Sequence, residues 1–203
     1  MTVASAYRTV AGLLVLVLTA CASAPVALVA LPPAPAAATR DTGPGVSLLL
    51  RELTVPGYLD SFPVVVGRDG SALVVSKNTE WAERPSAGVA RVLRDALSQR
   101  LDASRVLVAG ERRIPDVDLT VEFLALDPKA TALHLDARWF FSCTAAHGSR
   151  GGRSQFDVPL ASATPAAVAA ATTAALARFA DVLVDAIPTE CPHGNPAAAR
   201  RKA

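Results

Sequence analysis

The most regular pattern in the chain is an alternation of apolar and polar residues in its second half. Apolar side chains occupy nearly every second position over residues 117–126, 133–141 and 156–160. A period of two is typical of strands that bury one face and leave the other in water. Asp127-Pro128-Lys129 forms the turn after the first segment, and we interpret Gly148–Gly152 as a flexible hairpin tip after the second. The pattern therefore predicts an antiparallel meander of three strands.

Shorter strand-like segments occupy the first half of the chain. Strands are expected near residues 46–55, 63–66, 72–76 and 106–109. Pro56-Gly57 ends the first of them, and Arg68-Asp69-Gly70 is typical of the hairpin turn between the second and the third.

Two segments have the apolar spacing of amphipathic helices. The first runs from Glu83 to Leu101 with Pro85 in its first turn. The second runs from about Pro165 to Ile187, with Thr164 as a cap. Because each helix has one apolar stripe to bury, the sequence predicts an α+β fold. We expect a single domain with a mainly antiparallel sheet and both amphipathic helices packed on one face.

The N-terminus carries a secretion signal. Arg8 and an apolar run from Val10 to Leu18 precede the sequence Leu18-Thr19-Ala20-Cys21, which has the form of a lipobox. Residues 1–20 are then a lipoprotein signal peptide, and Cys21 is the lipidation site. Several acyl chains on Cys21 would hold the protein stably at a membrane surface.

Two alternatives to lipidation stay open. No charged residue occurs from Thr9 to Thr39, so the run from Val10 to Leu31 is long enough to be an uncleaved membrane anchor. Ordinary signal cleavage could instead follow Ala34-Pro35-Ala36. In all three cases Arg8 stays inside and the remainder is exported to face the periplasm. Ala22 in place of an aspartate after Cys21 favours the outer membrane over the inner one.

The remaining boundaries follow from composition. Residues 21–45 are rich in alanine and proline, and we interpret them as a tether behind the acylated cysteine. Residues 46–192 are about one domain in length, and residues 193–203 are expected to form a disordered tail. The net charge of +2 is nearly neutral, which argues against a nucleic-acid partner and against a strongly basic membrane-binding patch.

Export also gives meaning to the cysteines. If lipid occupies Cys21, Cys143 and Cys191 are left as a pair in an oxidising compartment, and a disulfide is the favoured interpretation. A zinc site that adds His147 and His193 is the alternative, although this spacing of ligands is unusual. We expect no metal and no cofactor.

Catalytic motifs are scarce. The chain has no Gly-x-Ser-x-Gly elbow. Ser154 and Asp157 lie near His147 in sequence, but proximity on a hairpin does not define a triad. Asp116 and Asp118 are interpreted as a solvated strand edge, and the sequence predicts that the protein is not an enzyme.

Two segments carry a resemblance to a known family. Val55-Pro56-Gly57-Tyr58-Leu59-Asp60 is followed by Pro63–Val66, and Asn78-Thr79-Glu80-Trp81-Ala82-Glu83 is followed by Ala90–Leu97. This arrangement resembles the ABC-type transport auxiliary lipoprotein family, which includes the lipoprotein subunit of paraquat-inducible intermembrane transport systems. Arg84-Pro85-Ser86 departs from the more apolar helix start expected for the family, and so does the cysteine pair.

The resemblance implies a non-catalytic accessory role. The expected partners are an MCE-domain protein and the subunits of an ABC transporter or related permease, in a system that moves lipids or other hydrophobic molecules between membranes. A homo-oligomer is also expected. Tyr58 and Leu59 follow a Pro-Gly turn and are candidate docking residues, with burial under the sheet edge as the alternative. Trp81 is either a docking residue or a core anchor.

One other function is kept. The protein could act alone as a periplasmic lipid- or ligand-binding lipoprotein. That role needs a pocket between the helices and the sheet that is large enough for acyl chains.

Overall fold

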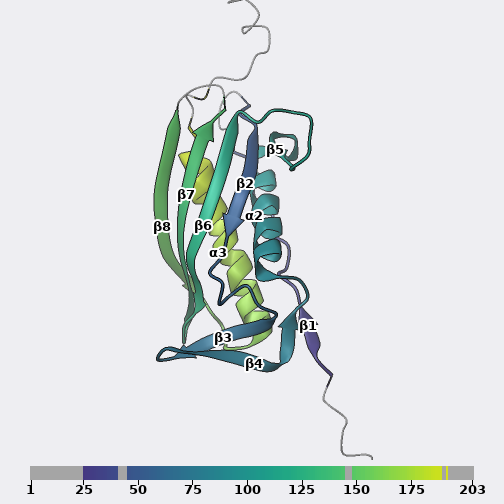
Figure 1. The fold of residues 1–203 in the computed structure, drawn as a ribbon, viewed down its shortest axis with the longest axis vertical. Helices are drawn as coiled ribbons and strands as arrows, with labels where there is room; N and C mark the ends of the chain where they lie inside the picture. The colour runs from purple at the N-terminus through teal and green to yellow at the C-terminus, as the bar shows by residue number, and fades with distance from the viewer. Residues whose placement is uncertain (1–24, 41–44, 145–147, 189–190, 192–203) are drawn as a thin grey trace, which may run out of the picture.

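The computed structural model describes residues 25–40, 45–144, 148–188 and 191. Two β-sheets and two long helices form the described fold (Figure 1). The elements in chain order are β1 (Ala27–Val29), β2 (Leu48–Thr54), β3 (Pro63–Asp69), β4 (Ala72–Trp81), α2 (Pro85–Leu101), η1 (Ala103–Arg105), β5 (Val106–Leu107), β6 (Val117–Pro128), β7 (Ala132–Cys143), β8 (Ser149–Pro159) and α3 (Pro165–Ala186).

The larger sheet has five strands in the order β5-β2-β6-β7-β8. Strands β6, β7 and β8 pair antiparallel, with Val121 opposite Trp139 and Leu135 opposite Phe156. The alternate side chains Val117, Leu119, Val121 and Phe123 are all buried, so the predicted meander and its buried face are confirmed.

The sheet is mixed because β2 runs parallel to both β5 and β6. Helix α2 lies between β2 and β5 in the chain. A crossover connection that includes a helix returns the chain to the end of the sheet at which the previous strand started. The next strand therefore starts in the same direction. The antiparallel part of the sheet is its second half, from β6 to β8.

Both helices cover the same face of this sheet, as predicted (Figure 1). Leu93 and Leu97 of α2 and Leu176, Phe179 and Leu183 of α3 are fully buried between the layers. Thr164 caps α3 by accepting a hydrogen bond from the amide of Ala167. The α+β class is confirmed. Within the described residues α3 is the one helix long and apolar enough to cross a membrane, yet 67% of that stretch is buried in the fold, as in a core helix.

The second sheet is small and lies at one end of the molecule. Its order is β1-β4-β3. Strands β3 and β4 form the predicted hairpin, with Gly70 at a positive φ in the turn. Strand β1 adds to the opposite edge of β4 in parallel, from Ala27 beside Thr79 to Val29 beside Trp81.

Residues 25–40 form what we call the strap, and they correct the predicted tether. After β1 the strap passes along α2 and α3, where Leu31 and Ala34 are buried. The carbonyl of Pro32 accepts a hydrogen bond from Thr173 Oγ1 at 3.0 Å, and the amide of Ala34 donates to Asp95 Oδ2 at 3.3 Å. An extended Ala/Pro segment exposes backbone polar groups and small apolar side chains. The two helices provide hydrogen-bonding side chains for the first and apolar surface for the second. The tether interpretation is therefore wrong for residues 25–40.

A second correction concerns the interpretation of residues 148–152 as a flexible tip. Gly151 and Gly152 belong to the paired part of β8, opposite Phe140 and Trp139. These glycines leave space for the two aromatic rings.

Candidate docking and anchoring sites

The two segments that carry the family resemblance meet beside the N-terminus of α2. The Oδ1 atom of Asp60 accepts a hydrogen bond from the amide of Ser86 at 2.9 Å, and the amide of Trp81 donates to the carbonyl of Phe62 at 2.7 Å. Arg84, the N-cap residue of α2, makes no side-chain cap of its own. Asp60 therefore supplies the cap from a loop 26 residues away. Sequence reasoning missed this role, because a cap is sought next to its own helix.

Leu59 and Trp81 point into the fold. Both pack against the core and line an apolar cavity of about 40 Å³, which Leu31 of the strap also lines. The cavity lies between the small sheet, the strap and the start of α2, where Val89 is buried. Within the described structure these two side chains hold the loop at residues 56–62 in place.

Tyr58 points outward and is 38% exposed. Its hydroxyl donates a hydrogen bond to Asp127 Oδ1 at 2.8 Å, and Arg68 lies 4.9 Å from the centre of its ring. Partial burial raises the pKa of the Tyr58 hydroxyl above 10.0, and the neighbouring Asp127 carboxylate raises it further. Tyr58 is therefore a neutral, amphipathic side chain at the surface.

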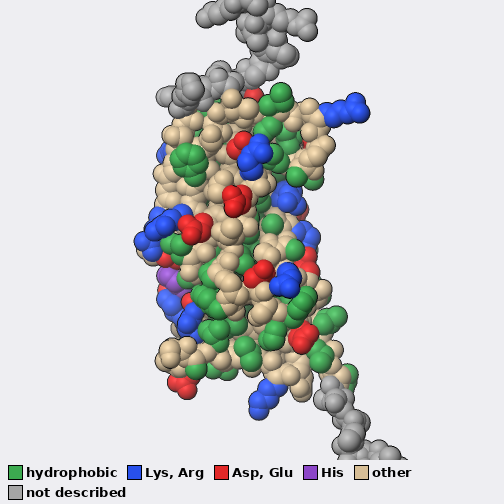
Figure 2. All heavy atoms as spheres, viewed as in Figure 1, with side chains coloured by type: hydrophobic (Ala, Val, Ile, Leu, Met, Phe, Trp, Pro, Cys, Tyr) green, Lys and Arg blue, Asp and Glu red, His purple; other side chains and the backbone are tan. Residues whose placement is uncertain are grey.

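Five other exposed apolar side chains lie in the small sheet or in the residues next to its strands. We call this group the apolar end: Val26, Leu28, Tyr58, Phe62, Val74 and Val75. Figure 2 shows hydrophobic side chains gathered over the end of the molecule that β3 and β4 form in Figure 1. Arg84 lies 5.4 Å from the centre of the Phe62 ring. Apolar and aromatic surface with cationic neighbours suits contact with another protein or with a lipid surface.

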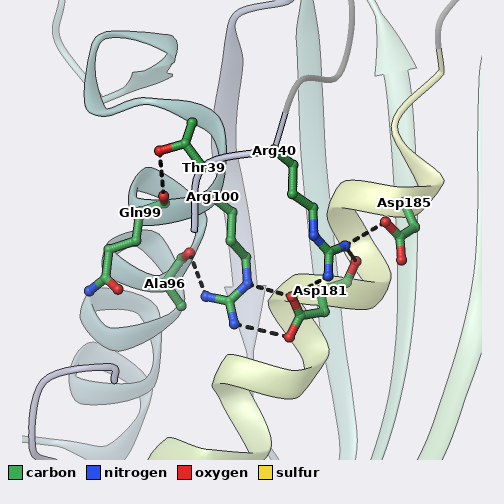
Figure 3. A network of polar contacts seen from close by, with 7 residues as sticks. All are labelled: Thr39, Arg40, Ala96, Gln99, Arg100, Asp181 and Asp185. Atoms are coloured by element: carbon green, nitrogen blue, oxygen red, sulfur yellow. Dashed lines mark hydrogen bonds and ion pairs between the residues drawn. The ribbon is translucent and has the colours of Figure 1, made fainter. Parts of the chain in front are cut away.

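A polar network fixes the far end of the strap to both helices (Figure 3). The buried Arg100 of α2 donates from Nε and Nη2 to both carboxylate oxygens of Asp181 on α3, at 2.8 and 3.0 Å. Arg40 of the strap donates to the same carboxylate at 2.7 Å and forms an ion pair with Asp185. Hydrogen bonding from Arg100 holds the pKa of Asp181 below its usual value of 3.8. The network joins three segments that are distant in sequence, and for that reason no local pattern indicates it.

The two cysteines meet at the end of the molecule that is opposite the apolar end. The structure brings Cys143, the last residue of β7, together with Cys191 as a disulfide with Cα atoms 5.4 Å apart. In the described part of the chain no group of three or more His, Cys, Asp or Glu residues is arranged to hold a metal ion. Cys21, His147 and His193 lie outside the described residues, and so do residues 193–203.

The solvated face of the larger sheet carries charged pairs. Asp136 accepts hydrogen bonds from Arg153 at 2.8 and 2.6 Å and from Gln155 at 2.8 Å. Hydrogen bonding from Arg153 lowers the pKa of Asp136 from 3.8 to about 2. Glu122 lies opposite Arg138 with 3.8 Å between their charged atoms.

An open groove of about 440 Å³ crosses this face beside the half-exposed ring of Phe140. It is lined by Thr120, Glu122, Arg138, Trp139, Phe140, Gly152 and Arg153. The groove combines one exposed aromatic side chain with charges of both signs, which is a composition suited to a protein partner.

Ser154 and Asp157, the two described members of the possible catalytic group, do not come together. Ser154 is buried under the helices, where its hydroxyl accepts a hydrogen bond from Trp139 Nε1 at 3.0 Å. Asp157 is on the solvated face, hydrogen-bonded to His134. Because residues 154 and 157 differ by an odd number along a strand, their side chains lie on opposite faces.

These features define an α+β domain whose recognisable motifs, Tyr58-Leu59-Asp60 and Trp81, build one end of the fold. The match to a known family agrees with this. Residues 30–184 match the ABC-type transport auxiliary lipoprotein component family, and the chain belongs to that family. A comparison with curated proteins finds no match.

Two solved structures share the fold. One is the crystal structure of an uncharacterized protein, with a TM-score of 0.65 and 17% sequence identity, covering 81% of this chain and 100% of that one. The other is a DUF330 protein from Xanthomonas campestris, with a TM-score of 0.60 and 17% identity, covering 77% of this chain and 92% of that one. At this identity the likeness concerns the fold alone.

Proposed function

We propose that the protein is a lipid-anchored accessory component of an ABC/MCE-type intermembrane transport system and acts by docking rather than catalysis. The family is that of a transport auxiliary lipoprotein component. The MCE-domain partner, the lipid or hydrophobic cargo and the homo-oligomer follow from the resemblance of residues 55–60 and 78–83 to the lipoprotein subunit of such systems.

The packed strap is the observation that carries the anchor at Cys21. An uncleaved span from Val10 to Leu31 conflicts with it, because β1 pairs with β4 and Leu31 is buried in the domain. Without the strap, residues 10–24 remain, which as a helix would reach about 22 Å across a hydrocarbon core of about 30 Å. Cleavage after Ala36 would remove β1 and two buried residues from the fold. Lipidation at Cys21 leaves the whole strap in place.

The cavity volume favours docking over an independent carrier role. Binding pockets for small molecules have volumes of about 300–1,000 Å³. The cavity between helices, strap and sheet has about 40 Å³, which is room for a water molecule or two rather than an acyl chain. The larger hollow is the open groove beside Phe140, and we assign it to the transporter partner.

A pull-down from detergent-solubilised envelopes tests this role. The wild-type protein is expected to recover MCE-domain or permease subunits. Phe140→Asp is expected to lose most of that recovery, because it places a charge in the groove. Ile114→Asp is the matched control, since Ile114 is 78% exposed and lies away from the groove. Recovery of no transporter component by the wild type would refute the accessory role.

A separate experiment tests the anchor. Intact mass of the mature protein is expected to show acyl chains on Cys21, and Cys21→Ser is expected to fold normally but leave the membrane. Fractionation of the two membranes then checks the outer-membrane assignment that Ala22 favours. A Cys21→Ser protein that stays fully membrane-bound would support an uncleaved anchor instead.

A further inference from the structure

The exposed apolar side chains of this protein are concentrated at one end. Of the nine large hydrophobic residues exposed in the described structure, six belong to the apolar end. The other three are Val108 and Ile114, which follow β5, and Phe140 in the groove. Exposed apolar side chains gathered in one region of a soluble protein mark surfaces that contact another protein or a membrane.

The chain length places this end next to the anchor. Val26 is five residues after Cys21, so an extended chain allows at most about 18 Å between them. The opposite end is farther away, because β6 alone has 12 residues and spans about 40 Å. In Figure 1 the long axis of the molecule runs from β3 and β4 at the bottom to the opposite ends of β6, β7 and β8 at the top, and Cys143 is the last residue of β7. A lipid on Cys21 therefore brings the apolar end, and not the disulfide end, to the bilayer.

The chemistry of the end fits a lipid headgroup layer. Tyr58 and Phe62 each have an arginine beside the ring, and such amphipathic pairs sit where one side is apolar and the other is wet. Asp127, which accepts a hydrogen bond from Tyr58, also forms an ion pair with Arg68 at 3.2 Å, and Asp60 caps α2. Their charges are therefore compensated within the protein.

We propose that the apolar end is a membrane-contact surface: with Cys21 in the bilayer, Leu28, Tyr58, Phe62, Val74 and Val75 rest in the headgroup region. The domain then stands with its long axis away from the membrane, which leaves the groove beside Phe140 open to a partner. This inference rests on the proposed lipid anchor, but it does not depend on the identity of the transporter.

Hydroxyl-radical footprinting with mass spectrometry tests the contact, because side-chain oxidation reports solvent exposure. The lipidated protein is reconstituted in vesicles of phosphatidylethanolamine and phosphatidylglycerol, and Cys21→Ser is mixed with the same vesicles. Phe62 and Phe140 are a matched pair at 43% and 47% exposed. Anchoring is expected to lower oxidation of Phe62 at least about threefold and to leave Phe140 unchanged.

A second variant checks that the apolar side chains cause the contact. Val74→Asp with Val75→Asp should reduce the protection of Phe62 by about half or more, because charged side chains leave the headgroup–acyl boundary. Ile114→Asp should leave it intact. Both changes are at exposed positions, so folding is retained.

Equal oxidation of Phe62 in the anchored and released proteins would overturn the proposal. Protection of Phe62 that requires added transporter proteins would also overturn it, and would make the apolar end a protein-docking surface. An intact mass without acyl chains refutes the anchor and this contact together. A failed pull-down with Phe62 still protected refutes the accessory role alone.

Discussion

At the scale of single residues, two glycines in β8 create space for the aromatic side chains of β7. A Cβ atom at Gly152 would lie 2.4 Å from Cζ2 of Trp139, and a Cβ atom at Gly151 would lie 3.1 Å from Cδ2 of Phe140. Trp139 also donates a hydrogen bond to Ser154, so its ring cannot shift without losing that contact. A glycine-rich sequence here serves packing rather than flexibility.

Gly152→Ala should therefore destabilise the protein. We expect a loss of about 1–3 kcal/mol in the free energy of unfolding, which is the usual cost of overpacking. Urea unfolding followed by circular dichroism measures it. Gly67→Ala is the matched control, because Gly67 is also in a strand and a Cβ atom there meets nothing within 4 Å. Equal stability of the two variants would contradict this account.

The ion pair between Asp136 and Arg153 makes stability depend on pH. Hydrogen bonding from Arg153 lowers the pKa of Asp136 from 3.8 to about 2. The ionised form of Asp136 is therefore more stable in the folded state than in the unfolded state. The stabilisation is complete above about pH 4 and is lost as the pH falls toward 2. This pKa shift corresponds to about 2 kcal/mol in the free energy of unfolding. We expect about half of that contribution, because the Arg153 side chain is 51% exposed and water screens the ion pair.

Asp136→Asn is expected to lower stability by about 1 kcal/mol at pH 7 and to flatten the acid dependence between about pH 4 and 2. Unfolding curves at several pH values measure both effects. Glu122→Gln is the control: its pair with Arg138 is exposed and 3.8 Å apart, so little change is expected. An unchanged acid dependence in Asp136→Asn would count against the assignment.

At the scale of elements, the strap converts a predicted tether into part of the folded domain. It lies along α2 and α3 and ends in the network of Arg40, Arg100 and Asp181. If Cys21 carries the proposed lipid, the chain between it and the folded strap is short, and the domain would be held close to the membrane rather than given reach across the envelope.

Leu31→Ala tests the packing of the strap. Leu31 is 6% exposed and lines the cavity, so we expect a loss of about 2 kcal/mol, together with faster proteolysis within residues 25–40. Leu28→Ala is the matched control, because Leu28 is three residues away and 67% exposed. Similar stability and similar proteolysis of both variants would mean that the strap does not contribute to the fold.

The elements also show what the sequence can and cannot predict. Both helices and the β6–β8 meander follow from periodicities of 3.6 and two, which are local properties. The strap depends on partners such as Thr173, which is 141 residues from Pro32. The parallel pairing of β2 with β6 depends equally on distant residues. The sequence names Tyr58, Leu59 and Trp81 as docking candidates, but which of them face outward depends on the packing of Leu31 and α2.

At the scale of the whole molecule, the fold separates three surfaces along its length. The apolar end is next to the predicted lipid, the groove beside Phe140 crosses the solvated sheet face, and the disulfide lies at the far end. An adaptor needs such separation, because a surface that rests on a membrane is not available to a second partner.

The disulfide secures the far end of this arrangement. Cys143 and Cys191 are 48 residues apart in sequence, and the loop they close contains β8 and α3. In the chain-entropy model a disulfide that closes a loop of this length stabilises the fold by about 4 kcal/mol, and measured values for native disulfides are about 2–5 kcal/mol.

We expect Cys143→Ala with Cys191→Ala to lower the free energy of unfolding by about 2–4 kcal/mol. Urea unfolding with and without dithiothreitol measures this, with Cys21→Ser as the control that keeps the pair. If dithiothreitol shifts the urea unfolding curve of Cys21→Ser but not that of the double variant, the disulfide forms in the exported protein. If dithiothreitol shifts neither curve, Cys143 and Cys191 remain as thiols, and the far end of the molecule depends on packing alone.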